Sequence, residues 1–382
     1  MKSAQRNGCT ARSRWIVALT ILASIGAGLD IPGSARAATN PSPLPADDLL
    51  RRPAIHRAIG TERIAVIVCL VPNDTTDPLY ASFARQRRLD VHLSPARAAE
   101  LANAHVTPYF QALSRGRYVP TFHAQGAIRL ASDEGPRSCF ERARDAKGPE
   151  YSTFLAIDNS QYLGGLGSAG ISPYVLGVDL PTLDITNRGR GVYVGGGVFA
   201  ASRYAVAWHE IGHALHWPHS HTNPNNHYDN PVDLMGGNYD LPLAMNVLAA
   251  GWMDDDEVAQ HRSGRTVLTV SPLMSRGTQV VVIRNPNDRF DVLTVEHRPR
   301  VFGSDPGVAI HRIEQDAIGC GFRGTEPCLS TERRQSPALG RSGSLDHVLR
   351  VGQSATVDGV TIGVIGRTND GFIVCVFGTY TP

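Results

Sequence analysis

The chain has 382 residues and a formal net charge of +2; 42% of its residues are hydrophobic and 19% are charged. That length allows two domains, each large enough to bury a core of its own. The nearly neutral charge balance excludes the strongly basic composition typical of nucleic-acid-binding proteins, so no nucleic-acid partner is predicted.

Residues 1–37 are predicted to be a secretory signal peptide. A basic segment at positions 2–14 precedes an apolar run at 15–28, which is too short to cross a membrane comfortably. Ala35-Arg36-Ala37 then matches the small-residue pattern at which such signals are cleaved. We therefore expect a secreted, extracellular protein with no stable membrane association after cleavage near Ala37. An uncleaved membrane anchor is the alternative.

Five cysteines remain once the predicted signal is removed, namely Cys69, Cys139, Cys320, Cys328 and Cys375. Export permits disulfides. Cys320 and Cys328 flank a short loop that contains glycine and proline, and they are the first predicted pair. Cys69 and Cys139 are a second candidate pair, which leaves Cys375 over. No Cys-x-x-Cys pair occurs in the chain, so a cysteine-based zinc site is not expected.

Residues 38–60 are predicted to be a linker or a short pro-segment, because positions 39–53 are rich in proline, alanine and aspartate. The next segment alternates β-branched apolar runs with helical patterns, and Ser94-Pro95 is typical of a helix start. The predicted strands are 64–71, 117–130 and 151–157, and the predicted helices begin at 95 and span 138–147. This order predicts an α/β half-domain.

Two glycine-rich segments follow. Residues 164–170 are predicted to form a flexible loop near the active-site cleft, because the Gly-Lys-Ser/Thr of a phosphate-binding loop is absent. Residues 191–199 are predicted to be an edge strand. An edge strand at this place can bind an extended peptide by β-augmentation.

The sequence His209-Glu210-Ile211-Gly212-His213 carries the clearest chemical signal. Histidines four residues apart lie on one face of a helix, one turn apart, where both imidazoles can point at one Zn²⁺. Glu210 then stands beside the open position of the metal. The opposite face of this helix is predicted to be buried through residues at 4, 3, 4 spacing, which are Tyr204, Trp208, Ile211 and Leu215.

A third histidine ligand must come from beyond the helix. On a straight helix His216 would lie roughly 10 Å from His209, which is too far for both to reach one ion. Pro218 predicts that the helix ends near residues 215–216. After such a turn His219 can swing back to the metal, so His219 is the predicted third ligand, with water in the fourth position. His221 is the alternative ligand.

This segment resembles the metzincin signature H-E-x-x-H-x-x-G-x-x-H with its Met-turn. The signature positions are occupied by His209, Glu210, His213 and His219, and Met235 falls on the Met-turn. One residue departs from the pattern, since His216 stands at the glycine of the turn. A positive φ there costs a non-glycine residue about 1–2 kcal/mol, although histidine is among the residues enriched in that region.

The wider sequence is similar to the secreted gametolysin-like and immune-inhibitor-A-like metalloproteases over roughly residues 61 to 315. The similarity is carried by residues 230–236, 250–252, 292–298 and 307–311. It implies an α+β fold in which residues 61–256 form a metzincin-like catalytic domain with a mixed sheet, helices, a zinc helix and a Met-turn. It also implies one catalytic Zn²⁺ and hydrolysis of protein or peptide substrates by a zinc-bound water, with Glu210 as general base.

Two further features of the site are considered. Some metzincins use a tyrosine shortly after the Met-turn as an extra transition-state donor, and Tyr239 and Tyr228 are the candidates here. Ca²⁺ is considered because of the acidic run at residues 254–257, but no EF-hand spacing exists and such a run is more typical of a solvated turn.

Residues 257–382 have a different character, with short β-branched runs separated by turn residues and no helical periodicity. These runs are 265–270, 279–284, 291–297, 308–313, 347–351, 360–365 and 372–377. Regular short strands predict a β-sandwich-like C-terminal domain. The sequence leaves the oligomeric state open.

Two other functions compete with the endopeptidase. One is a zinc hydrolase that acts on a non-protein or cell-wall amide substrate, for which the zinc helix would look the same. The other is a catalytically inactive secreted binding protein. The complete set of three histidines with Glu210 disfavours the second, because structural zinc usually has a closed shell of four protein ligands.

Overall fold

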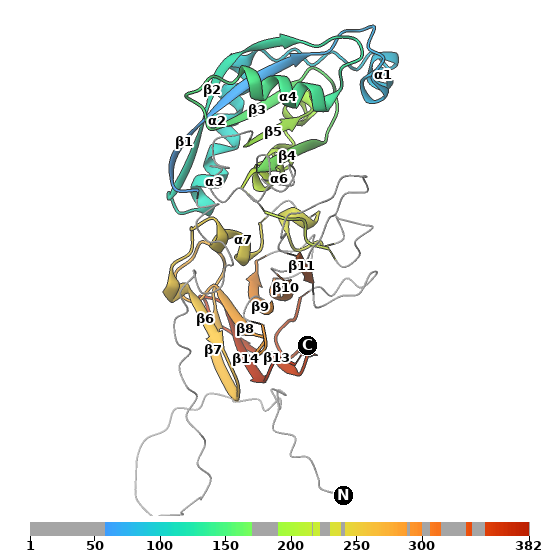
Figure 1. Ribbon diagram of the computed structural model, residues 1–382. Coiled ribbons are helices and arrows are strands. Elements are labelled where there is room, and N and C mark those ends of the chain that lie inside the picture. The colour runs from blue at the N-terminus through green and yellow to red at the C-terminus, as the bar shows by residue number, and fades with distance from the viewer. Residues whose placement is uncertain are drawn as a thin grey trace, which may run out of the picture.

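The computed structural model describes residues 58–169, 190–215, 217–221, 230–237, 241–288, 291–299, 306–314, 334–337 and 348–381. It is a mixed α/β structure in which one sheet with helices is followed along the chain by two further sheets (Figure 1). The predicted signal peptide and most of the predicted linker lie outside the described residues.

The first sheet has the strand order β2-β1-β3-β5-β4. Its strands are β1 Gly60–Leu70, β2 Tyr118–Arg129, β3 Thr153–Asp158, β4 Gly165–Ala169 and β5 Arg190–Val194. The neighbours β2, β1, β3 and β5 run parallel, and β4 is antiparallel to β5. Three of these strands confirm the runs predicted at 64–71, 117–130 and 151–157.

Helices cover both faces of this sheet, because successive side chains of a buried strand point to opposite sides. Ile64, Val66 and Val68 of β1 pack with residues of three helices on one face, α2 Pro95–His105, α3 Thr107–Leu113 and α6 Tyr204–Ala214. The alternate β1 residues pack on the other face with Tyr80 and Phe140, from α1 Pro78–Arg85 and α4 Pro136–Ala146.

Helix starts follow local sequence. The Ser94 side chain accepts a hydrogen bond from the Arg97 N–H at the start of α2, and Pro95 occupies the first turn, which confirms that predicted start. The helix expected at 138–147 is α4, which begins two residues earlier at a proline.

The disulfide between Cys69 of β1 and Cys139 of α4 is present, which confirms that predicted pair. Cys375, on β14 Phe372–Gly378, is also disulfide-bonded, so the prediction that it is left over is wrong. Cys320 and Cys328 lie outside the described residues.

The two glycine-rich segments differ from their predictions. Residues 165–169 form strand β4 rather than a loop, and β4 is the last strand of the sheet among the described residues. The segment predicted as an edge strand at 191–199 divides into β5, which has β3 and β4 on its two sides, and the short helix α5 Gly196–Ala200. Gly165 and Gly167 pack closely against helix α6, as described below, whereas Gly191 packs against the Phe154 ring of β3.

The second half of the chain forms two sheets, ordered β11-β10-β9-β8-β6 and β12-β13-β14-β7. The strands not yet bounded are β6 Val258–His261, β7 Arg265–Val270, β8 Val280–Arg284, β9 Asp291–Arg298, β10 Gly307–Glu314, β11 Arg334–Pro337, β12 Ser354–Val357 and β13 Val360–Arg367. One hydrophobic cluster contains residues of both sheets, among them Val295 of β9 and Val374 of β14. The two sheets therefore share a core.

Six of the seven predicted β-branched runs lie in strands. The exception is 347–351, where Leu349 makes an isolated bridge to Val308. The short strands β6, β11 and β12 were not predicted from the sequence.

The two halves of the chain also share packing. The largest hydrophobic cluster runs from Ala58 through α6 and Met235 to Val292 of β9 and Ile313 of β10. The other faces of β9 and β10 supply the core between the two sheets. Within the described residues, no helix is both long and apolar enough to cross a lipid bilayer.

Candidate metal centre

Helix α6 is held by apolar side chains along one side. Ile211 is buried there, and Leu215 caps the C-terminal end and is also buried. Tyr204 and Trp208 are only half-buried. Their rings stack on His105 and Tyr109 at ring-centroid distances of 4.3 and 4.0 Å. The predicted buried face is therefore confirmed at its C-terminal end and is partly open at its N-terminal end.

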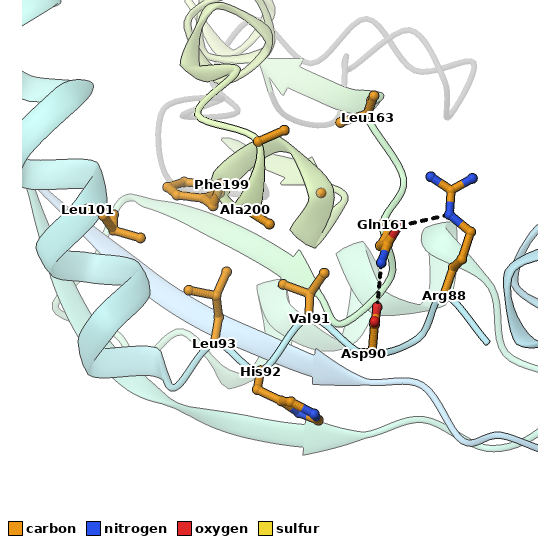
Figure 2. A pocket seen from close by; sticks show the side chains of 12 residues that line it. Arg88, Asp90, Val91, His92, Leu93, Leu101, Gln161, Leu163, Phe199 and Ala200 are labelled. Carbon is orange, nitrogen blue, oxygen red and sulfur yellow. Dashed lines mark hydrogen bonds between the residues drawn. The ribbon is translucent and has the colours of Figure 1, made fainter.

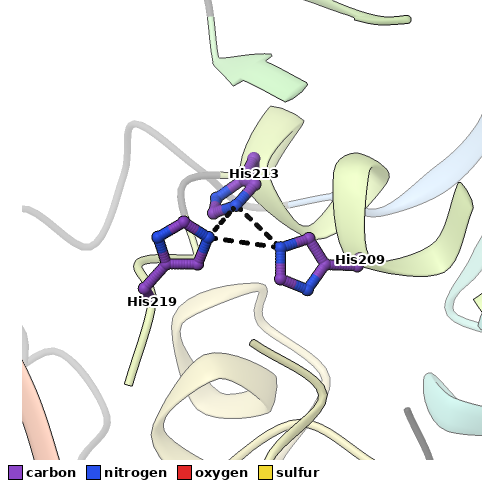
Figure 3. A group of neighbouring side chains, drawn as sticks. All are labelled: His209, His213 and His219. Carbon is purple, nitrogen blue, oxygen red and sulfur yellow. Dashed lines mark hydrogen bonds between the residues drawn. The ribbon is translucent and has the colours of Figure 1, made fainter. Parts of the chain in front are cut away.

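Three histidine side chains converge at the end of this helix (Figure 3). His209 and His213 come from α6, which ends at Ala214 as the proline downstream predicted. His219 comes from the segment that folds back after the helix. The Nε2 atoms lie 3.1 Å apart for His209 and His213, 2.9 Å for His213 and His219, and 3.3 Å for His209 and His219.

The other ring nitrogens of the two helical histidines face backbone carbonyls. His209 Nδ1 lies 2.9 Å from the Leu234 carbonyl oxygen, and His213 Nδ1 lies 2.9 Å from that of Trp217. A carbonyl can only accept, so both Nδ1 atoms carry the proton and donate it. Burial lowers the pKa of both imidazoles, which keeps them neutral. Each Nε2 then presents a lone pair.

Lone pairs that face one another at this distance cannot form hydrogen bonds among themselves, and they suit a shared cation instead. Three nitrogens bound tetrahedrally at about 2.0–2.1 Å would lie about 3.3–3.4 Å from one another, close to the spacing of the three Nε2 atoms. The donor set therefore fits a small divalent ion. Among the His, Cys, Asp and Glu side chains of the described residues, these three histidines form a group whose ligand atoms could share one ion.

Glu210 follows the first histidine on α6 and is 6% exposed. Burial raises the pKa of its carboxyl group to about 8, although a hydrogen bond from the Gly167 backbone N–H opposes the rise. A positive charge beside a buried carboxyl group favours its ionised form. A dication held by the histidines would therefore return Glu210 toward the carboxylate.

Strand β4 lies directly against α6 at this point. A Cβ on Gly165 would come within 2.5 Å of Glu210 Cγ, and a Cβ on Gly167 would come within 2.1 Å of the Glu210 carbonyl oxygen. Any side chain at these positions would force the strand and the helix apart. The two glycines therefore allow a backbone N–H of β4 to reach the Glu210 side chain.

Met235 lies beneath the histidine cluster. It is fully buried in the short 3-10 helix Leu234–Gly236, and a Cβ on Gly212 of α6 would lie 2.8 Å from its sulfur. The preceding carbonyl, that of Leu234, is the one that orients His209. Met235 therefore packs against α6 at Gly212, which lies between His209 and His213 in the sequence.

Of the remaining predicted site residues, the structure describes His221. His221 is described and half-buried, and it is not in the three-histidine group. His216, Tyr228 and Tyr239 lie outside the described residues.

The acidic run at 254–257 is bound by arginines. The Arg117 guanidinium bonds to Asp254, and Arg115 bonds to Glu257 with both guanidinium nitrogens. Asp254 and Glu257 also form a reciprocal capping box at the start of a 3-10 helix. Their carboxylates thus serve an ion-paired turn, which gives no support to a calcium site there.

Two features around the site were not predicted from the sequence. They are the packing of Gly165 and Gly167 against Glu210, and a buried polar group formed by Ser220, Asn230, Asp233, Glu296, Arg298 and His311. The available signal for the second group was the presence of charged residues at alternate positions of an otherwise apolar strand at 292–298. Alternate positions share one face of a strand.

A separate pocket of about 500 Å³ lies beside α5 (Figure 2). Gln161 closes its polar end by accepting from Arg88 Nε at 2.8 Å and donating to Asp90 Oδ1 at 2.7 Å. Leu101 and Phe199 line its apolar side. None of the three clustered histidines lines this pocket, so it is not part of the metal centre.

Comparisons with known proteins give little further guidance. No family model matches the chain, and no curated protein matches it. Among solved structures, the chain is similar to the crystal structure of metalloproteinase-II from Bacteroides fragilis, with 14% identity and a TM-score of 0.26. The match covers 52% of this chain and 54% of that chain, so this chain spans about half of that neighbour's length. This likeness is too distant to support a function. The proposed function therefore rests on the geometry of the site itself.

Proposed function

We propose that the chain is a secreted zinc-dependent endopeptidase of the metzincin type. The observation that carries the proposal is the convergence of three imidazole Nε2 atoms, from His209, His213 and His219, beside the buried carboxyl group of Glu210. Three protein ligands leave one coordination position open, which is the arrangement of catalytic rather than structural zinc.

The metal is proposed to be zinc because the donor set consists of nitrogen atoms alone. Imidazole suits zinc and other late transition metals, whereas calcium and magnesium take oxygen ligands. The two backbone carbonyls that hold Nδ1–H of His209 and His213 are the outer partners that zinc-binding histidines usually have.

In the proposed reaction, a bound zinc ion would lower the pKa of water toward about 7 and polarise the scissile carbonyl. Glu210 acts as the general base, taking a proton from the attacking water and passing it to the leaving amine. The Gly167 N–H holds the Glu210 side chain in place during both transfers. Met235 supports the helix beneath the ligands.

The peptide substrate is proposed to extend along β4 rather than along the segment 191–199. β4 is the last strand of its sheet among the described residues, and it adjoins Glu210. An extended peptide can add to such an edge through backbone hydrogen bonds. The expected partner is thus a protein or peptide substrate, with no nucleic-acid partner and no stable membrane association after signal cleavage.

The chain is proposed to divide into a signal peptide at 1–37, a linker or short pro-segment at 38–60, a catalytic domain at 61–256 and a β-sandwich-like domain at 257–382. The disulfide between Cys69 and Cys139 supports export, because such bonds persist in oxidising compartments.

The proposal is tested with the secreted protein and unfolded casein. We expect cleavage that a zinc chelator abolishes and that added zinc restores. Glu210→Gln should keep one zinc per chain while hydrolysis falls by roughly 10²–10⁴-fold, the usual contribution of a general acid–base group. Retained activity in Glu210→Gln would contradict the role of Glu210.

Two other outcomes separate the competing functions. One zinc per chain without casein cleavage would favour a hydrolase of non-protein or cell-wall amides. A chain that binds no zinc would favour the secreted binding protein.

A further inference from the structure

A buried polar group connects the second half of the chain to the candidate metal centre. It contains Ser220, Asn230, Asp233, Glu296, Arg298 and His311, and it is called the polar bridge below. All six side chains are buried, each with at most 2% of its surface exposed. Such groups must be satisfied by one another, because an unpaired polar group in the interior is costly.

On the side of the metal centre, the polar bridge begins one residue after His219. The Ser220 hydroxyl donates to Asp233 Oδ2 at 2.5 Å and accepts from Asn230 Nδ2 at 2.8 Å. A Cβ on Gly236 would lie 2.5 Å from Asn230 Cβ and 2.6 Å from Ser220 Oγ. The segment that carries His219 is therefore locked to the turn that carries Met235.

On the other side, the polar bridge ends on two strands of the second half, β9 and β10 (Figure 1). Asn230 Nδ2 lies 3.2 Å from His311 Nε2, and His311 Nδ1 lies 3.4 Å from Glu296 Oε1. Glu296 Oε2 accepts from the Ala244 N–H at 2.9 Å and from Arg298 at 3.2 Å.

Arg298 adds contacts to the chain between the Met235 turn and α7 Ala244–Ala249. Its guanidinium donates to the Leu241 carbonyl at 2.6 Å and to the Pro242 carbonyl at 2.8 Å. Asp233 Oδ1 accepts from the Leu243 N–H at 3.0 Å in the same stretch. Arg298 and Asp233 thus hold residues 241–243, which follow the Met235 turn, in place.

The hydrogen bonds define one direction along the polar bridge. Asn230 Oδ1 accepts from the Val232 N–H, so the Asn230 amide nitrogen faces Ser220 and His311 and donates to both. His311 Nε2 must then accept, which puts the ring proton on Nδ1, facing Glu296. The contact of His311 Nδ1 with Glu296 Oε1 at 3.4 Å is electrostatic rather than a hydrogen bond, and it places the ring N–H toward the carboxylate.

We propose that Glu296 and His311 are positioning residues for the metal centre, and that they act through Asn230 and Ser220 on His219. The inference rests on the proposed function, and it assigns the β9–β10 pair to the metalloenzyme unit rather than to an accessory binding module. Neither residue belongs to the three-histidine group itself. Their effect is to hold the third ligand at the distance from α6 that a shared ion needs.

The test compares two buried histidines of the second half, one inside and one outside the polar bridge. His297 follows Glu296 on β9, but its ring packs against Phe372 with a centroid distance of 4.8 Å. His311→Leu and His297→Leu each remove a buried imidazole, so their general effects on folding are matched. His311→Gln keeps an acceptor for Asn230 and serves as the rescue variant.

The measurement is the dissociation constant for zinc of the secreted chain, obtained by competition with a chromophoric chelator. We expect His311→Leu to raise it roughly 10–100-fold, the range found when outer partners of metal ligands are lost. His297→Leu should stay within about threefold of wild type and His311→Gln should recover most of the loss. Hydrogen exchange at the Ser220 amide should speed up in His311→Leu alone.

Equal zinc affinities for His311→Leu and His297→Leu would overturn the inference, as would a His311→Gln variant as weak as His311→Leu. If His311→Leu does not fold, Glu296→Gln replaces it, and zinc binding like that of wild type in Glu296→Gln would likewise overturn the inference. A wild-type chain that binds no zinc would reject the proposed function as well. If the wild-type chain binds one zinc and the variants have the same zinc affinity, only the positioning role is rejected.

Discussion

Two glutamate–arginine pairs, one half-buried at Glu62 and one fully buried at Glu296, lie in the two halves of the chain and differ in what they hold. Glu62 of β1 accepts from Arg190 of β5, and also from Tyr118 at 2.6 Å and Thr153 at 2.5 Å. Arg190, Tyr118 and Thr153 all belong to strands of the first sheet. Glu296 pairs with Arg298 and belongs to the polar bridge, whose other end lies next to His219.

The electrostatics of the two pairs are similar. Burial alone would raise the pKa of Glu62, but the charge of Arg190 and hydrogen bonds from its neighbours hold it below the usual value. Burial likewise opposes ionisation of Glu296, yet His311 and Arg298 lower its pKa. Similar chemistry therefore stabilises one sheet in the first case and connects two parts of the molecule in the second. The role of a buried ion pair depends on what its partners are attached to.

The largest expected effect concerns the ligand next to the polar bridge. His219→Ala removes one of three ligands and should weaken zinc binding by roughly 3–4 kcal/mol, or 10²–10³-fold in dissociation constant. His221→Ala, two residues away, should leave zinc affinity nearly unchanged. The measurement is zinc titration of both variants. Loss of zinc in His221→Ala with retention in His219→Ala would show that the third ligand is assigned wrongly.

A smaller effect separates the two ion pairs. Glu62→Gln leaves Arg190 without its charged partner and should reduce the free energy of unfolding by about 2–3 kcal/mol, below the range for fully breaking a buried pair because the amide keeps some hydrogen bonds. Chemical denaturation of the metal-free and zinc-loaded protein measures this loss. Zinc affinity should stay within about twofold, since no partner of Glu62 contacts the site. A drop in zinc affinity as large as that of His219→Ala would remove the distinction between the pairs.

The smallest expected effect is a pH dependence confined to the second half. Burial, with the nearby charges of Arg367 and Arg298, lowers the pKa of His297 to about 4. Because the unfolded chain binds this proton near pH 6.5 and the folded chain does not, His297 contributes stability above about pH 6.5 that is lost as pH falls toward 4. The loss should be about 1–2 kcal/mol after allowance for solvent screening.

The check on this prediction is a pair of denaturation series from pH 7 to pH 4.5, on zinc-loaded wild type and His297→Leu. The difference between the two free energies of unfolding should shrink as the pH falls. A constant difference would mean that His297 takes up its proton equally in the folded and unfolded chain.

The sequence predicted features that depend on local spacing. The pairing of the two helical histidines follows from their four-residue separation, and the return of His219 follows from Pro218, which ends the helix. β-branched runs located most strands, because burial of both faces leaves a continuous apolar segment.

Features that depend on distant neighbours were predicted poorly. Residues 165–169 were predicted as a loop, because glycine richness looks the same whether it supplies flexibility or admits a packed helix. The contact between Asn230 and His311 spans 81 positions, and no local pattern indicates which buried polar residues meet across such a distance. The bonding of Cys375 could not be predicted either, because five cysteines remain after the predicted signal and spacing does not show which of them is paired.

The absence of side chains at Gly165 and Gly167, where β4 meets α6, has a consequence for protein engineering. Gly165 and Gly167 have no room for even a methyl group, so a library that varies this strand should keep both codons fixed. Leu166 of β4 and Leu163, two residues before that strand, are 37% and 38% exposed and therefore have room for new side chains. Selection for altered peptide preference should therefore enrich changes at these two leucines, while the glycines persist through every round.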